Sequence, residues 1–149
     1  MIKSFRIVLF VVCVLGITPA LSAEEVAEKS TVSTKEFDWE PVMNAIIQVE
    51  SEGDVKAVSG KSCGAMQITP ILVKECNAIL KERNSKTRYT LRDRFNLEKS
   101  KEMFLLMQSK FNPSNNVEKA IRAWNGGNNY NKKRTQRYFE KVMKELKKH

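Results

Sequence analysis

The chain is almost without histidine. Of its 149 residues, only the last, His149, carries an imidazole. Ser-His and Cys-His nucleophile pairs need an ordered imidazole beside the nucleophile, and a terminal residue is badly placed to supply one. Zinc sites built on histidine are disfavoured for the same reason. No glycine loop of the phosphate-binding kind is present. The chemistry that remains is acid–base catalysis by carboxyl groups, with no cofactor and no metal.

Long hydrophobic runs are also missing. The main apolar run, residues 7–17, has eleven residues and is too short to favour a membrane helix. It follows a basic start and precedes small residues that end at Ala23. This pattern predicts a signal peptide over residues 1–23 and export to the periplasm, the cell envelope or the medium. An uncleaved anchor is the alternative. Residues 24–36 are polar and are predicted to be a flexible linker.

Cysteine is scarce as well. Apart from Cys13 in the predicted signal peptide, the chain has Cys63 and Cys76. In an oxidising compartment these two could form a disulfide, which would stabilise the fold by about 3 kcal/mol by restricting the unfolded chain. Two free, partly buried thiols are the alternative, and the sequence leaves both open.

Acidic residues are outnumbered by basic ones. The chain has 26 Lys and Arg against 17 Asp and Glu, a net charge of +9. A basic exported protein is expected to bind an anionic partner, such as a cell-wall polymer, a membrane surface or nucleic acid. The basic residues are spread through loops and the C-terminal tail and are not interleaved with aromatic residues, which argues against nucleic acid.

Apolar residues recur at helical spacing in five segments, and no convincing strand pattern or internal repeat is present. The residues between Asn84 and Arg94 are polar and basic and are predicted to be a mobile connection. Residues 37–149 are therefore predicted to form a single compact all-α domain. The predicted helices cover about residues 39–51, 70–83, 97–111, 117–126 and a last segment around Tyr138, Val142 and Leu146.

Glycine beyond the signal peptide is confined to two loops, one after Glu50 and one after Trp124. Because glycine lets the backbone approach a ligand, these loops are expected to form two walls of one groove. Glu50 ends a short apolar helix and faces the first loop, where burial would raise the pKa of its carboxyl. It is therefore the candidate proton donor, with a surface glutamate as the alternative. The glycines are Gly53, Gly60, Gly64, Gly126 and Gly127.

Several short motifs follow one another in the chain. They are Glu50-Ser51, Ala57-Val58-Ser59, Gly64-Ala65-Met66-Gln67-Ile68, Ala123-Trp124-Asn125-Gly126-Gly127 and Tyr138 before Lys141-Val142. Their order and approximate spacing resemble the catalytic domain of the soluble lytic transglycosylases, which is related to goose-type lysozyme. The resemblance covers roughly residues 37–142 and implies a helical, lysozyme-like fold with little or no sheet and a glycan groove. It implies cleavage of the β-1,4 bond between N-acetylmuramic acid and N-acetylglucosamine in peptidoglycan, without water, leaving a 1,6-anhydro sugar.

The same resemblance implies roles for individual residues. Glu50 would be the single catalytic group, first an acid and then a base. The others would bind or frame the substrate: Ser51, Gln67 and Asn125 by contacting sugar, Met66 by lining the groove, and Tyr138 by setting Glu50 through its hydroxyl. Each of these five also has a purely structural alternative. The chain departs from the family pattern at Ala65, usually leucine, and at Trp124, commonly tyrosine, which alters packing more than chemistry.

Two other functions stay open. A hydrolysing lysozyme on the same scaffold would use a second carboxylate, for which no acid is marked among Glu52, Asp54, Glu75 and Asp93. A non-catalytic helical module that binds the cell wall would need no carboxylate at all. The expected partners are peptidoglycan glycan strands, with a secretion or conjugation apparatus as an open possibility, and the protein is expected to be a monomer.

Overall fold

A computed structural model describes residues 37–148, and five α-helices hold more than half of these residues. The predicted signal peptide and linker lie outside the described residues. The structure confirms the mostly helical class. The elements, in order, are α1 (Glu40–Ser51), β1 (Val58–Ser59), β2 (Ser62–Cys63), α2 (Pro70–Glu82), the 3-10 helix η1 (Leu91–Phe95), α3 (Leu97–Phe111), α4 (Val117–Gly126) and α5 (Lys132–Leu146).

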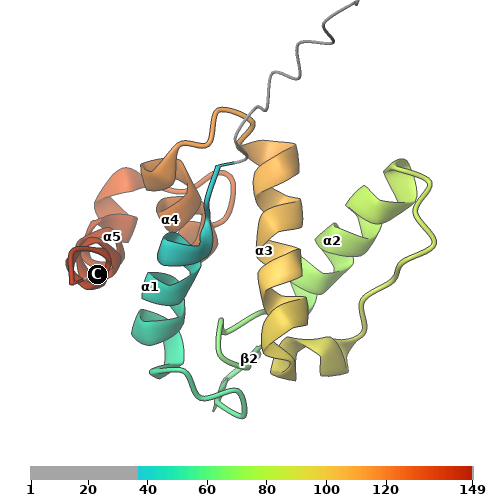
Figure 1. Cartoon of the computed structure of the whole chain (residues 1–149), viewed down its shortest axis with the longest axis horizontal. Helices are drawn as coiled ribbons and strands as arrows, with labels where there is room; N and C mark the ends of the chain where they lie inside the picture. Colours follow the sequence, from blue (N-terminus) through green and yellow to red (C-terminus); the bar gives the residue numbers. More distant parts are fainter. Residues whose placement is uncertain (1–36, 149) are drawn as a thin grey trace, which may run out of the picture. The chain divides into compact units, whose positions relative to one another are not determined.

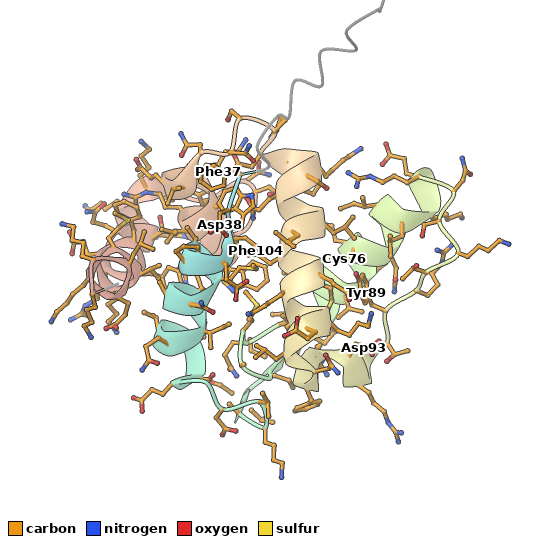
Figure 2. The ribbon with its side chains drawn as sticks, in the orientation of Figure 1. Phe37, Asp38, Cys76, Tyr89, Asp93 and Phe104 are labelled. Carbon is orange, nitrogen blue, oxygen red and sulfur yellow. The ribbon has the colours of Figure 1, made fainter. Side chains whose placement is uncertain are left out.

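Helix α3 lies between α1 and α2 (Figure 1). Its fully buried Phe104 packs edge-on against Trp39 at the start of α1, with ring centroids 5.6 Å apart, and against Trp124 of α4 at 5.2 Å. Figure 2 shows Phe104 in the space beside α1. Three aromatic rings from three helices thus form the centre of the core, and they fix the ends of α1 and α4 relative to each other.

The predicted helix starts are confirmed at two places. Thr69 accepts a hydrogen bond from the backbone N–H of Leu72 ahead of Pro70, and Asn96 accepts one from Lys99. Both side chains satisfy donors that the first turn leaves free. Helix α1 starts one residue later than predicted, at Glu40, whose N–H bonds to the Asp38 carboxylate.

The structure contains one very small sheet, in agreement with the expected fold with little or no sheet. Residues 58–59 and 62–63 pair as a two-stranded antiparallel hairpin, with Val58 opposite Cys63 and Ser59 opposite Ser62. The turn between them is made by Gly60, whose φ of +59° favours glycine. A strand of two residues is too short to leave an alternating pattern in the sequence.

The segment between Asn84 and Arg94, which was predicted to be a mobile connection, is anchored to α2 by hydrogen bonds. The Asn77 side chain exchanges two 2.8 Å hydrogen bonds with the backbone of Tyr89, which is buried. The chain then turns into η1, where Arg94 is buried. The polar composition of this segment does not indicate the anchoring, because the segment contributes only backbone groups to these two bonds, and every residue has those groups. Among residues 37–148, no helix combines the length and the apolar content needed to cross a membrane.

Of the two states that the sequence left open for Cys63 and Cys76, the structure has the free thiols, both of them buried. Cys63 lies in the hairpin, where its backbone bridges to Ile68. Cys76 lies between α2 and α3 (Figure 2), with its sulfur 3.8 Å from the carbonyl oxygen of Met103. The two thiols occupy different packing environments, so the alternative of two free thiols is the one observed.

Candidate active site

Glu50 lies in the last turn of α1 and is partly buried. The helix ends one residue later, at Ser51, because Glu52 takes a left-handed conformation, with φ of +54°. Burial raises the pKa of the Glu50 carboxyl above its ordinary value of 4.5, and a hydrogen bond from Tyr138 partly opposes that rise. Because burial is the larger effect, the site favours the protonated acid that a proton donor requires.

Tyr138 reaches Glu50 from α5, which packs along α1. Its hydroxyl donates a 2.7 Å hydrogen bond to Oε1 of Glu50. Burial and the negative charge of Glu50 both raise the pKa of Tyr138, so the phenol keeps its proton. The predicted contact between these two residues is present in the structure.

The Glu50 carboxyl opens onto a polar pocket of about 230 Å³ between the hairpin region, the start of α2 and the end of α4. Three residues proposed from the sequence, Glu50, Gln67 and Asn125, meet here. Glu50 is the one carboxyl group in this lining. Ser59, Ser62 and Thr69 add three hydroxyls. The full lining is Glu50, Ser59, Ser62, Gln67, Thr69, Leu72, Trp124 and Asn125.

Gln67 has a structural role in addition to its place in the pocket. Its Nε2 donates to the carbonyl oxygens of Gly64 at 2.9 Å and Ala57 at 3.4 Å. Its own backbone adopts φ of +51°, which is uncommon for a residue with a side chain. The amide N–H groups are therefore engaged with the loop, and the amide oxygen is the atom left for a ligand.

Besides Tyr138, two residues proposed from the sequence are absent from the pocket lining. The Ser51 hydroxyl donates to the carbonyl oxygen of Ala65 at 2.8 Å and ties the end of α1 to the following loop. The side chain of Met66 is 0% exposed, which corresponds to its packing alternative and not to a place in the groove lining. Its backbone carbonyl accepts a 3.2 Å hydrogen bond from Nε1 of Trp124. This bond ties the Gly64 loop to the end of α4, so it connects the two walls of the pocket.

The sequence analysis did not identify Arg94 as part of the site. Its side chain hydrogen-bonds to the backbone of the hairpin region, which forms one wall of the pocket. The side chain is 8% exposed and donates to the carbonyl oxygens of Leu91, Lys61 and Ile68. Its own carbonyl packs so tightly against Gly64 that a Cβ added there would lie 1.7 Å from the oxygen. In the sequence Arg94 was one basic residue among several in a polar segment, and nothing distinguished it.

The other acids once considered as a second catalytic carboxylate are not in the pocket lining. Glu52 and Asp54 are exposed. Asp93 accepts from Thr90 at the start of η1, and Glu75 lies 3.4 Å from the Asn128 amide. Among residues 37–148, no group of three or more His, Cys, Asp or Glu is arranged to hold a metal ion.

The structure is thus a helical domain in which one carboxyl group, at the end of α1, opens onto a polar pocket between two loop walls. The family model Transglycosylase SLT domain matches residues 30–147, and the chain belongs to this family. The predicted resemblance and the lysozyme-like fold class are thereby confirmed. Membership indicates a transglycosylase-type enzyme acting on peptidoglycan. Searches of curated proteins and of solved structures returned no match.

Proposed function

We propose that the protein is a peptidoglycan lytic transglycosylase in which Glu50 is the only catalytic carboxyl. It cleaves the β-1,4 bond between N-acetylmuramic acid and N-acetylglucosamine and leaves a 1,6-anhydro end. The observation that carries the proposal is that Glu50 is alone in its pocket, is partly buried, and is held by Tyr138 at 2.7 Å.

In the first step, protonated Glu50 gives its proton to the glycosidic oxygen while the bond from that oxygen to C1 of N-acetylmuramic acid breaks. The bonding electron pair leaves with the N-acetylglucosamine oxygen. In the second step, the 6-hydroxyl of the same N-acetylmuramic acid attacks C1 and passes its proton to the Glu50 carboxylate. The acid is regenerated and no water enters the products.

The lining supports this reaction over hydrolysis. A two-carboxylate glycosidase needs a second Asp or Glu about 5–9.5 Å from the first, across the scissile bond. The pocket lining holds hydroxyl and amide groups in place of a second acid. These neutral groups suit hydrogen bonds to sugar hydroxyl and N-acetyl groups, and Asn125 and Gln67 would contact the sugar from opposite walls.

The proposed setting is the cell envelope, reached through the signal peptide predicted over residues 1–23. The substrate there is a glycan strand of peptidoglycan. A role in opening the wall for a secretion or conjugation apparatus is compatible with this setting. The hydrolysing lysozyme is the second candidate, and it has no observation in its favour beyond the shared fold.

The mass of the reaction products tests the proposal. Purified peptidoglycan digested to completion should yield muramic ends one water lighter than reducing ends. Chemical reduction with borohydride should leave those ends unchanged, because an anhydro sugar has no free aldehyde. Reducible ends in the products would show that the protein is a hydrolase and not a lyase. The absence of any cleavage would favour the non-catalytic wall-binding module.

A further inference from the structure

A second groove lies between the end of α1 and α5. It encloses about 270 Å³ and shares no residue with the lining of the Glu50 pocket. Its position relative to the candidate active site follows from α5. Lys141 lies about one helical turn beyond Tyr138, the residue that bonds Glu50, on the same side of this helix. The groove is therefore about one turn of α5 away from the Glu50–Tyr138 pair. Its lining is Gln48, Val49, Glu52, Lys141, Lys144 and Glu145.

The charges in this groove are not neutralised by one another. Lys141 and Lys144 are exposed, and neither has a carboxylate within 4.0 Å among residues 37–148. Glu145 is already paired with Lys148 at 2.7 Å. Glu52 has no cation within the same distance in the described part of the chain. The groove thus presents two available ammonium groups and one available carboxylate to a ligand.

The two lysines belong to a longer basic stripe on α5. Four exposed basic residues recur at spacings of three and four, which places them on one helical face. Of the two acids of this helix, Glu145 lines the same groove but is paired with Lys148, which lies beyond the end of α5. Such an array raises the local concentration of a negatively charged ligand along the groove. The stripe is formed by Arg134, Arg137, Lys141 and Lys144.

We propose that this groove binds the stem peptide of peptidoglycan and selects stems whose carboxylates are free over stems whose carboxylates are amidated. The inference rests on the proposed function. The stem is attached to the lactyl group of N-acetylmuramic acid, the sugar whose glycosidic bond Glu50 would break. A strand positioned for cleavage therefore carries a peptide that starts next to Glu50.

The charges of the groove match that peptide. Lys141 and Lys144 pair with stem carboxylates, and Glu52 accepts the side-chain ammonium of a diamino acid in the stem. Amidation replaces a carboxylate by a neutral group and removes a partner from the lysines. A flat anionic membrane surface is a poorer match, because the site is concave and includes the negative charge of Glu52.

The test measures binding, so that it does not depend on turnover. The Glu50→Gln protein is titrated by calorimetry with three glycan tetrasaccharides, which carry free stems, amidated stems or no peptide. A second protein adds K141Q and K144Q. The matched control adds K81Q and K86Q, which removes two exposed lysines, one in the last turn of α2 and one in the connection that follows it; Figure 1 places α2 across the domain from α5.

We expect the Glu50→Gln protein to bind free stems about two- to fivefold more tightly than amidated stems or bare glycan, which is the range for an exposed charge pair. The K141Q/K144Q change should abolish that ratio while bare glycan binds as before. The K81Q/K86Q control should keep the ratio.

Equal affinity of the Glu50→Gln protein for all three ligands would overturn the proposal without any further variant. So would a K141Q/K144Q effect that is the same on bare glycan as on free stems. The protein could also fail to discriminate between stems but bind vesicles of anionic phospholipid, and lose that binding with K141Q/K144Q. This result would show that the stripe binds a membrane surface instead of the stem peptide. Failure of the lytic reaction itself would appear separately, as wild-type protein that binds stems but releases no anhydro ends.

Discussion

The hydroxyl of Tyr138 on α5 donates a 2.7 Å hydrogen bond to Oε1 of Glu50 on α1, across 88 positions of the chain. This bond engages one carboxyl oxygen, so in the proposed reaction Oε2 would carry the acid proton. The bond also restricts the orientation of the carboxyl at the edge of the pocket. We therefore propose that Tyr138 is a positioning residue whose effect would reach the substrate through Glu50.

Tyr138→Phe should lower kcat by about tenfold to a hundredfold, because the carboxyl loses its orientation. The hydrogen bond from Tyr138 lowers the pKa of Glu50, so its removal should raise that pKa further. The alkaline limb of the kcat/KM profile should then move to higher pH. Tyr89→Phe is the matched control, since Tyr89 donates to the Glu102 carboxylate at 3.2 Å and is not in the pocket lining. If Tyr89→Phe changed kcat and the pH profile as much as Tyr138→Phe does, Tyr138 would have no specific role in positioning Glu50.

Gly64→Ala should destabilise the protein by about 3 kcal/mol or more, because a Cβ there would lie 1.7 Å from the Arg94 carbonyl oxygen, at φ of +77°. Gly60→Ala is the matched control: its φ is also positive, at +59°, but nothing lies within 4 Å. We expect a cost of about 1 kcal/mol from the backbone alone. Denaturant titration measures both, and similar losses would show that the Arg94 contact can relax.

Glu50→Gln should stabilise the fold at neutral pH relative to the wild type. Burial raises the folded-state pKa of Glu50 above 4.5, so the folded protein holds this proton more tightly than the unfolded chain does. Stability is therefore lost as pH rises through the folded-state pKa, and the uncharged Gln escapes that loss. The difference in Tm should shift in favour of Glu50→Gln between pH 4 and pH 8. A constant difference over this range would contradict the burial of the carboxylate.

Cys63 and Cys76 should be recovered as free thiols that react only after unfolding. Burial raises the pKa of the Cys76 thiol to about 12, so its thiolate fraction at pH 8 is about one in 10⁴. Alkylation of the native protein followed by peptide mapping should leave both residues unmodified, and alkylation in denaturant without reductant should label both. Recovery of two peptides linked through Cys63 and Cys76 would show that the two residues form a disulfide and would contradict this prediction.

The positions of the helices and the candidate catalytic residue Glu50 could be predicted from the sequence, because both depend on local patterns. The apolar spacing of α1 and the caps at Thr69 and Asn96 are properties of neighbouring residues, and Glu50 stood at the end of such a pattern beside a glycine loop. The resemblance then connected Glu50, Gln67 and Asn125, and the structure brings these three together in one pocket.

What could not be predicted depends on contacts between residues far apart in the chain. Arg94 became a clamp only through carbonyl groups contributed by the hairpin region, which no spacing reveals. Met66 was assigned to the groove by its motif, yet its side chain points into the core and only its carbonyl is used, by Trp124. A motif identifies a position, but the backbone conformation decides which atoms of that residue face the ligand.

The most direct measurement of the central claim is the turnover of purified peptidoglycan by Glu50→Gln. The change keeps the size of the side chain and an oxygen for the Tyr138 hydrogen bond, but it removes the proton that the reaction transfers. We predict that release of anhydro ends falls by at least a thousandfold while the protein stays folded and still binds the wall. Release at a rate within tenfold of the wild type, from a folded protein, would contradict the assignment of Glu50 as the catalytic acid and base.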